Sequence, residues 1–165
     1  MSMLPPSEFA SPFETSPTRG LSPEAGRVES LLAELRKQAL ASVVLGKAKQ
    51  DALDSLYTIF CEGCRAGWDG YGASPASYES YLRARRFIEA LPADFPVPDI
   101  ALDPDGEVSL EWYHAPGRIF SVSVGANDEL NYAGRFSPTR KTHGTEPFTG
   151  HIPKMILDNI RRLLQ

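Results

Sequence analysis

The chain has 165 residues, of which 42% are hydrophobic and 23% charged, and its formal net charge is −4. These values are close to the globular average and exclude a wholly disordered, collagen-like or repetitive fibrous chain. No apolar run approaches about 18 residues, so we expect no transmembrane helix. The acidic balance argues against a general nucleic-acid coat.

Residues 1–22 are rich in Pro and Ser, and we predict a flexible tail there because such a composition buries little apolar surface. The first residues lack the basic and apolar regions of a secretory signal, and two cysteines are too few for a disulfide scaffold. We therefore expect a cytoplasmic protein in which a single domain, residues 23–165, follows the tail.

Residues 23–91 carry a helical pattern. Ser22-Pro23-Glu24 is a typical helix start, and apolar residues recur at helical spacing over 28–39 and again over 53–64. Gly46 lies between the two stretches, so the pattern fits either one long helix with a weak point or a hairpin of two helices.

A further helix is expected to begin at Ser74-Pro75 and to end near Leu91-Pro92. Its apolar stripe would consist of Tyr78, Tyr81, Leu82 and Ile88.

From residue 97 to residue 136 the period changes to two, which is typical of half-buried strands. Three alternating stretches are separated by turn sequences, and Asp99–Leu102 adds a short strand before them. Residues 137–150 look polar and irregular, and residues 152–165 form an amphipathic helix. Together, these expected helices and strands predict an α+β fold, in which an antiparallel three- to four-stranded meander packs against N-terminal helices and a C-terminal helix.

Cys61 and Cys64 form a C-x-x-C pair near the end of a predicted helix. A zinc site would need two further ligands from His114, His143 and His151, whose spacing is unsuitable, and a redox pair would normally lie at a helix N-terminus. We predict that both cysteines are small buried core residues, with no bound metal and no cofactor.

The most distinctive stretch is Trp68-Asp69-Gly70-Tyr71-Gly72. Two aromatic rings and a carboxylate on a glycine-rich loop can form a binding surface. The alternative is a structural corner, in which Trp68 fills the core between helices and Asp69 caps a backbone amide.

Charge is distributed unevenly along the chain. From Phe87 to Gly117 there is no Lys or Arg, and Asp103, Asp105 and Glu107 concentrate negative charge in a predicted hairpin turn. This turn lacks the later acids of a calcium loop. Solvated faces explain most such charge runs, but the acidic hairpin edge is also a candidate binding surface.

A basic stretch follows with Arg135, Arg140 and His143, near Glu146. A His beside a Glu could perform acid–base chemistry and the cations could hold an anion, so this stretch is the candidate for a small enzyme or a ligand-binding domain. No nucleophile elbow or nuclease-like acid spacing supports catalysis.

Four motifs in combination, Trp68–Ala73, Pro96-x-Pro98, Asp105–Trp112 and Tyr132-Ala133-Gly134, resemble a family of small bacterial proteins without established activity. The resemblance covers roughly residues 66–164. It implies a bacterial origin and a single recurring domain, and it supplies no catalytic residue.

Together these patterns favour a non-catalytic bacterial protein-interaction module, an accessory subunit or an inhibitor of the antitoxin, immunity or anti-defence kind. The partner would be another protein, bound at the acidic hairpin or at the Trp68–Tyr71 loop, with the tail adding a strand or clamp. A third hypothesis, nucleic-acid binding through Arg83, Arg85, Arg86 and Arg140, is disfavoured by the overall acidity.

Overall fold

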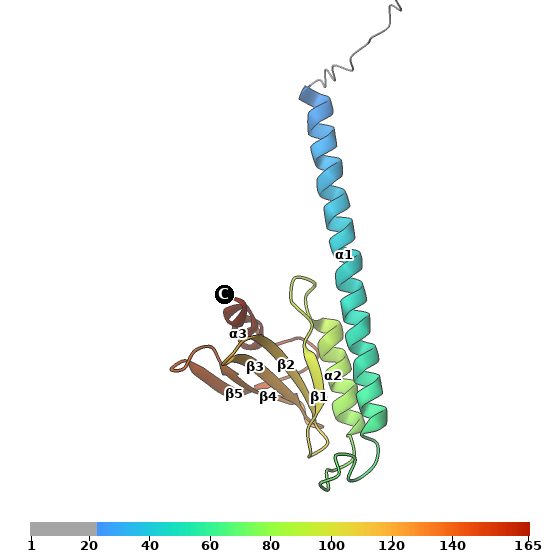
Figure 1. The fold of residues 1–165 in the computed structure, drawn as a ribbon, viewed down its shortest axis with the longest axis vertical. Helices are drawn as coiled ribbons and strands as arrows, with labels where there is room; N and C mark the ends of the chain where they lie inside the picture. The colour runs from blue at the N-terminus through green and yellow to red at the C-terminus, as the bar shows by residue number, and fades with distance from the viewer. Residues whose placement is uncertain (1–22) are drawn as a thin grey trace, which may run out of the picture. The chain divides into compact units, whose positions relative to one another are not determined.

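The structure, a computed structural model, describes residues 23–165 (Figure 1). The chain divides into two compact units, Met1–Gln38 and Ala39–Gln165. We call the described part of the first unit, residues 23–38, the N-terminal segment, and the second unit the sheet domain. The predicted tail, residues 1–22, lies outside the described residues.

Helix α1 spans Pro23–Glu62, so the long-helix alternative is correct and Gly46 does not interrupt it. A glycine inside a helix costs about 1 kcal/mol relative to alanine, which a long helix tolerates. In the sheet domain, α1 buries Ala52 and Leu56 in the core, and Leu53 packs against that core.

Helix α2 spans Tyr78–Ala90 and begins later than the Ser74-Pro75 start that we predicted. The Ser77 hydroxyl caps the helix by accepting the backbone N–H of Ser80 at 3.2 Å. Residues 74–77 are not helical because their backbone amides bond elsewhere, as described below. The helix ends at Leu91 as expected.

The apolar stripe predicted for α2 is partly wrong. Ile88 is buried, but Tyr78 is 56% exposed. Ala84 and Phe87, which the prediction omitted, are fully buried. The tyrosines instead lie beside α1, where the Tyr81 ring is 4.7 Å from that of Phe60.

The described residues contain one sheet with five antiparallel strands in the order β1-β2-β3-β4-β5. This confirms the α+β class and the meander, with more strands than predicted. The strands are β1 (Asp99–Leu102), β2 (Val108–Ala115), β3 (Arg118–Val124), β4 (Glu129–Arg135) and β5 (Lys141–Pro147).

Strand β5 lies inside the stretch 137–150 that we predicted to be irregular. It pairs with β4 over its whole length, from Lys141 opposite Arg135 to Pro147 opposite Glu129. An edge strand needs little apolar alternation, because its backbone hydrogen bonds to β4 hold it in place. Its residues are accordingly polar or small, which is why the period of two was missing.

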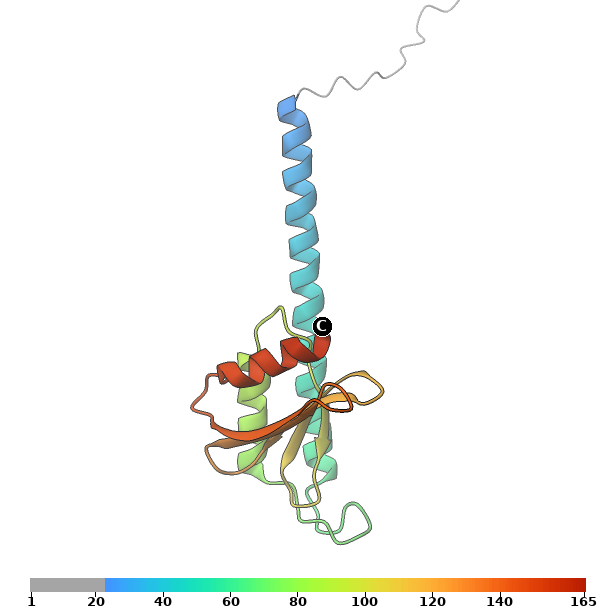
Figure 2. The ribbon, with the colours of Figure 1, turned by 90° about the vertical axis from the view of Figure 1, so that its left-hand side faces the viewer.

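One face of the sheet carries the core. Leu110, Val122 and Tyr132 lie in register on this face, and Leu110 and Val122 are fully buried. Phe87 of α2 packs here, with its ring 6.2 Å from that of Trp112. Figure 2 shows the helices beside the sheet. This burial of large apolar side chains is the main stabilising term of the domain.

The C-terminal helix α3 (Lys154–Leu164) completes the core with fully buried Ile156, Ile160 and Leu163. The side chain of Arg118, at the start of β3, donates a hydrogen bond to the carbonyl of Leu163. A cation at a helix C-terminus satisfies carbonyls that have no partner within the helix. The predicted amphipathic helix is therefore confirmed.

The opposite face of the sheet is polar, with Ser121, Ser123 and Asn131 on it, as the alternation over β2, β3 and β4 predicted. Among residues 23–165, no helix has the length and apolar character needed to cross a membrane.

Candidate interaction surface at one end of the sheet

The loop after α1 is held by its own hydrogen bonds. The Asp69 carboxylate accepts the backbone N–H groups of Tyr71 and Ala73 at 2.8 and 3.0 Å, and the Gly67 N–H donates to the Ala73 carbonyl at 2.8 Å. These amide bonds lower the pKa of Asp69, because they stabilise the charged carboxylate. Asp69 therefore caps backbone amides, as the structural-corner alternative proposed.

The two aromatic residues of this loop have different surroundings. Trp68 is half-buried, and its indole Nε1 donates to the Ser74 carbonyl at 3.0 Å. Tyr71 is 96% exposed and lies between Gly70 and Gly72, which both have a positive φ. The loop thus has a fixed backbone and a fully solvated aromatic side chain.

The acidic turn between β1 and β2 is also internally bonded. Asp105 accepts the backbone N–H of Glu107 at 3.0 Å. Partial burial, and then the neighbouring carboxylates, raise the pKa of Asp103 and of Glu107. Three acids are thus held close together, and their mutual repulsion would be relieved by a cation.

Backbone hydrogen bonds connect the loop after α1 to the acidic turn. Ser74 donates its N–H to the Pro104 carbonyl at 2.8 Å, and Ser77 donates its N–H to the Gly106 carbonyl at 2.9 Å. Gly106 has a φ of +89°, and a Cβ there would lie 2.3 Å from the Pro75 carbonyl oxygen. Only glycine fits this close approach.

Two surfaces that the sequence suggested separately are therefore neighbours. We call their union the aromatic–acidic end, which consists of Trp68, Asp69, Tyr71, Asp103, Asp105 and Glu107. This adjacency could not be predicted, because amide-to-carbonyl bonds between distant segments leave no side-chain pattern. The glycine at 106 was the only local hint of a close approach.

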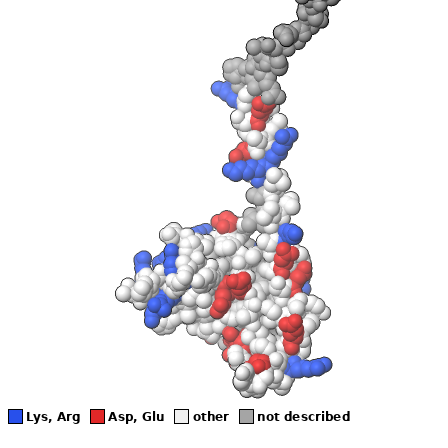
Figure 3. Space-filling view, in the orientation of Figure 1, with Lys and Arg blue, Asp and Glu red and all other residues white. Residues whose placement is uncertain are grey.

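The predicted basic residues lie elsewhere. Arg135 ends β4, Arg140 belongs to the following turn and His143 is on β5, all exposed. In an antiparallel meander, the β4–β5 turn lies at the opposite end of the strands from the β1–β2 turn. Figure 3 shows acidic side chains over the middle and lower part of the sheet domain and basic side chains at its left-hand end.

The arrangement required for acid–base chemistry does not form among these residues. His143 pairs with Ala133 and Glu146 with Leu130, so the two side chains lie on opposite faces of β5. Arg135 lies opposite Lys141 at the other end of the strand from Glu146. The structure does not bring Arg135, His143 and Glu146 together.

Two of the four arginines considered for nucleic-acid binding are paired with acidic side chains. Arg83 forms an ion pair with Asp128, and Arg85 donates to Glu89 at 2.9 Å. Arg86 is exposed on α2, and Arg140 belongs to the β4–β5 turn. Arg83 and Arg86 line one small pocket, which the carboxylate of Asp128 shares.

The prediction that Cys61 and Cys64 are buried is wrong, since both thiols are free and exposed. Cys61 is in the last turn of α1, and the Cys64 thiol donates to the Phe60 carbonyl at 3.1 Å. Their helical spacing put them beside the apolar face, but the core under α1 extends only as far as Leu56 and partly buried Phe60. Within residues 23–165, no three His, Cys, Asp or Glu side chains converge as metal ligands would.

A separate apolar groove of about 450 Å³ lies in the sheet domain, between α1 and the connection from α2 to β1. Its lining residues are Ser42, Gly46, Ala48, Lys49, Pro92, Ala93, Phe95, Pro96 and Val97.

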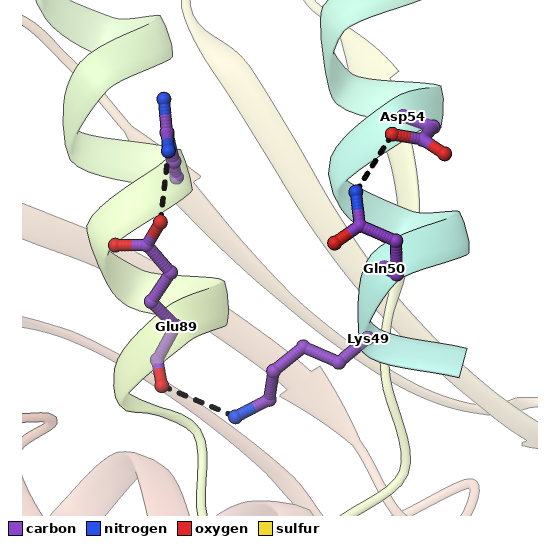
Figure 4. Close-up of polar contacts among 5 residues, drawn as sticks. Lys49, Gln50, Asp54 and Glu89 are labelled. Carbon is purple, nitrogen blue, oxygen red and sulfur yellow. Dashed lines mark hydrogen bonds and ion pairs between the residues drawn. The ribbon is translucent and has the colours of Figure 1, made fainter. Parts of the chain in front are cut away.

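Lys49 lines this groove and connects α1 to the end of α2. Its ammonium donates to the carbonyls of Glu89 and Leu91 at 3.1 and 2.7 Å, and Figure 4 shows it extending from α1 to the last turn of α2. Because this charge is already engaged, the walls suit apolar side chains of another protein better than a polar substrate.

No protein-family model, curated protein or solved structure matches this chain in the three comparisons with known proteins.

Proposed function

We propose that this chain is a non-catalytic protein-interaction module of a bacterial cytoplasm, an accessory subunit or an inhibitor, that binds a basic protein segment at the aromatic–acidic end. The motif resemblance supports the bacterial setting. The observation that carries the proposal is Tyr71, which is 96% exposed on a loop held by the amide bonds to Asp69 and clipped to the acidic turn.

An aromatic residue on a fixed backbone suits binding, because the loop itself loses little conformational entropy when the partner docks. Tyrosine is also among the residues that most often dominate interface energies. The three nearby carboxylates, two of them with raised pKa, favour a partner that brings Arg or Lys side chains. A cation over the Tyr71 ring would add a cation–π contact.

The test is a native pull-down at low salt with tagged full-length chain, using the wild type and the variants Tyr71→Ala and Asp105→Lys. Tyr113→Ala is the matched control, because Tyr113 is also exposed, at 60%, but lies at the far end of β2. We expect a protein that the wild type and the control recover and that the two other variants lose.

A partner retained by Tyr71→Ala and by Asp105→Lys would place the binding surface elsewhere. No recovered partner with any variant at low salt would contradict the interaction function. A direct probe, an Arg-rich peptide titrated into labelled protein, should shift the resonances of residues 69–73 and 103–107.

A further inference from the structure

The N-terminal segment exposes an amphipathic apolar stripe. Val28, Leu31, Leu32 and Leu35 are 54%, 64%, 46% and 59% exposed. Their spacing of i, i+3, i+4 and i+7 is that of a helix face that packs against another helix. None of the described residues of this segment is buried. The segment continues into the rest of α1, and its apolar side chains gain stability only where another apolar surface covers them.

We propose that this face pairs with the same face of a second copy, as an antiparallel helix pair. The proposal is independent of the aromatic–acidic end. Leu32 of one chain would face the partner's Leu35, and Leu35 the partner's Leu32. This pairing is isologous, so one twofold axis closes the contact into a dimer.

Charge selects this arrangement among the alternatives. Antiparallel reversal brings the same flank of both helices together, and that flank carries Glu29 and Arg36. With Leu32 opposite the partner's Leu35, Glu29 lies beside the partner's Arg36, and the twofold axis repeats the pair.

Two other arrangements that keep Leu32 in the contact lack this complementarity. Sliding the pair by one heptad, so that Leu32 faces the partner's Val28, places Glu29 beside the partner's Glu29. A parallel in-register pair places Leu31 beside the partner's Arg36 and forms no ion pair among residues 26–38. Of these three arrangements, the antiparallel register centred between Leu32 and Leu35 is the favoured one.

The apolar area of the contact sets the expected affinity of the dimer. Four exposed side chains per copy form a small patch, whereas a standard stable interface buries about 800 Å² per partner. We expect a weak, concentration-dependent dimer. Salt should weaken the dimer further, because it screens the attraction between Glu29 and the partner's Arg36.

Sedimentation velocity of the full-length chain over a concentration series tests the proposal. We expect a monomer–dimer equilibrium that Leu32→Asp abolishes and that Glu29→Arg or Arg36→Glu weakens about tenfold. The double variant Glu29→Arg/Arg36→Glu should restore dimerisation, because the ion pairs re-form with reversed signs. Lys37→Glu is the control, because Lys37 lies on the opposite side of α1 from the apolar stripe.

Orientation is tested by cross-linking in a background with exposed Cys61 and Cys64 changed to Ser. A mixture of Leu32→Cys and Leu35→Cys chains should give mainly mixed disulfide dimers. Dimers of Leu32→Cys with itself would show a parallel pair and overturn the antiparallel proposal. A wild type that stays monomeric at every concentration, or a charge-swapped double variant no better than the single ones, would overturn self-pairing.

Discussion

The N-terminal segment and the sheet domain use the same residue types for opposite purposes. Leu31 is 64% exposed on α1, whereas Leu110 on β2 is fully buried between helices and neighbouring strands. Both lie on regular amphipathic elements, and both stretches show the expected periodicity in the sequence. An apolar period therefore predicts a face that packs, but it does not show whether the same chain supplies the surface that covers that face.

The largest expected difference between the two regions is in stability. Leu110→Ala should lower the free energy of unfolding by about 2–5 kcal/mol, because it removes buried methyl groups and leaves a cavity. Leu31→Ala should change the unfolding of the sheet domain by less than about 0.5 kcal/mol. Urea denaturation followed by tryptophan fluorescence measures the free energy of unfolding of both variants. An equal loss of stability in the two variants would contradict the difference between the two regions.

Two glycines, one in each kind of backbone setting, should respond to alanine in opposite ways. Gly106→Ala should destabilise the sheet domain by about 2–3 kcal/mol, since Gly106 has a positive φ and a Cβ there would lie 2.3 Å from the Pro75 carbonyl oxygen. Gly46→Ala should instead stabilise α1 by about 0.5–1 kcal/mol, because nothing lies within 4 Å of a Cβ there. Thermal unfolding of the two variants should therefore move in opposite directions.

Removal of one helix cap should have a smaller effect. Ser77→Ala deletes the hydroxyl that accepts the Ser80 amide, and should cost about 1 kcal/mol. Ser77→Asp, which keeps an acceptor, is the control and should lie close to the wild type in the same urea titration. A loss as large with Asp as with Ala would mean that the cap is not the cause.

The smallest expected effect is a pH dependence at the acidic turn. The pKa of Asp103 is raised by burial and by neighbouring carboxylates, so the folded state binds its proton more tightly than the unfolded state does. The stabilisation from this proton is fully present below the unfolded pKa and is lost as the pH rises through the folded pKa. Relative to Asp103→Asn, the wild type should therefore gain stability when the pH is lowered from 7 toward 4, and a gain at rising pH would contradict the cause.

Local side-chain patterns were sufficient to predict much of the sheet domain. Alternation gave β2, β3 and β4, the Asp103–Gly106 turn was correct, and the C-terminal helix followed from its apolar spacing. Strand β5 was missed because its pairing with β4 rests on backbone hydrogen bonds, which leave polar side chains such as Lys141 and Thr145 unrestricted.

The candidate surface was predicted only in pieces. The sequence singled out Tyr71 and Asp105 by composition and turn chemistry. Their adjacency depends on the bonds from Ser74 and Ser77 to the acidic turn, which no local pattern encodes. The exposure of Cys61 and Cys64 was mispredicted for a related reason, because helical spacing does not show where the covering surface ends.

The most direct test of the interaction account is hydrogen–deuterium exchange on the full-length chain, with and without the partner that the pull-down recovers. Binding should slow exchange at residues 67–74 and 103–107, while exchange in β5, at the other side of the sheet, should be unchanged. Protection confined to Lys141–Pro147, with residues 67–74 unaffected, would contradict it.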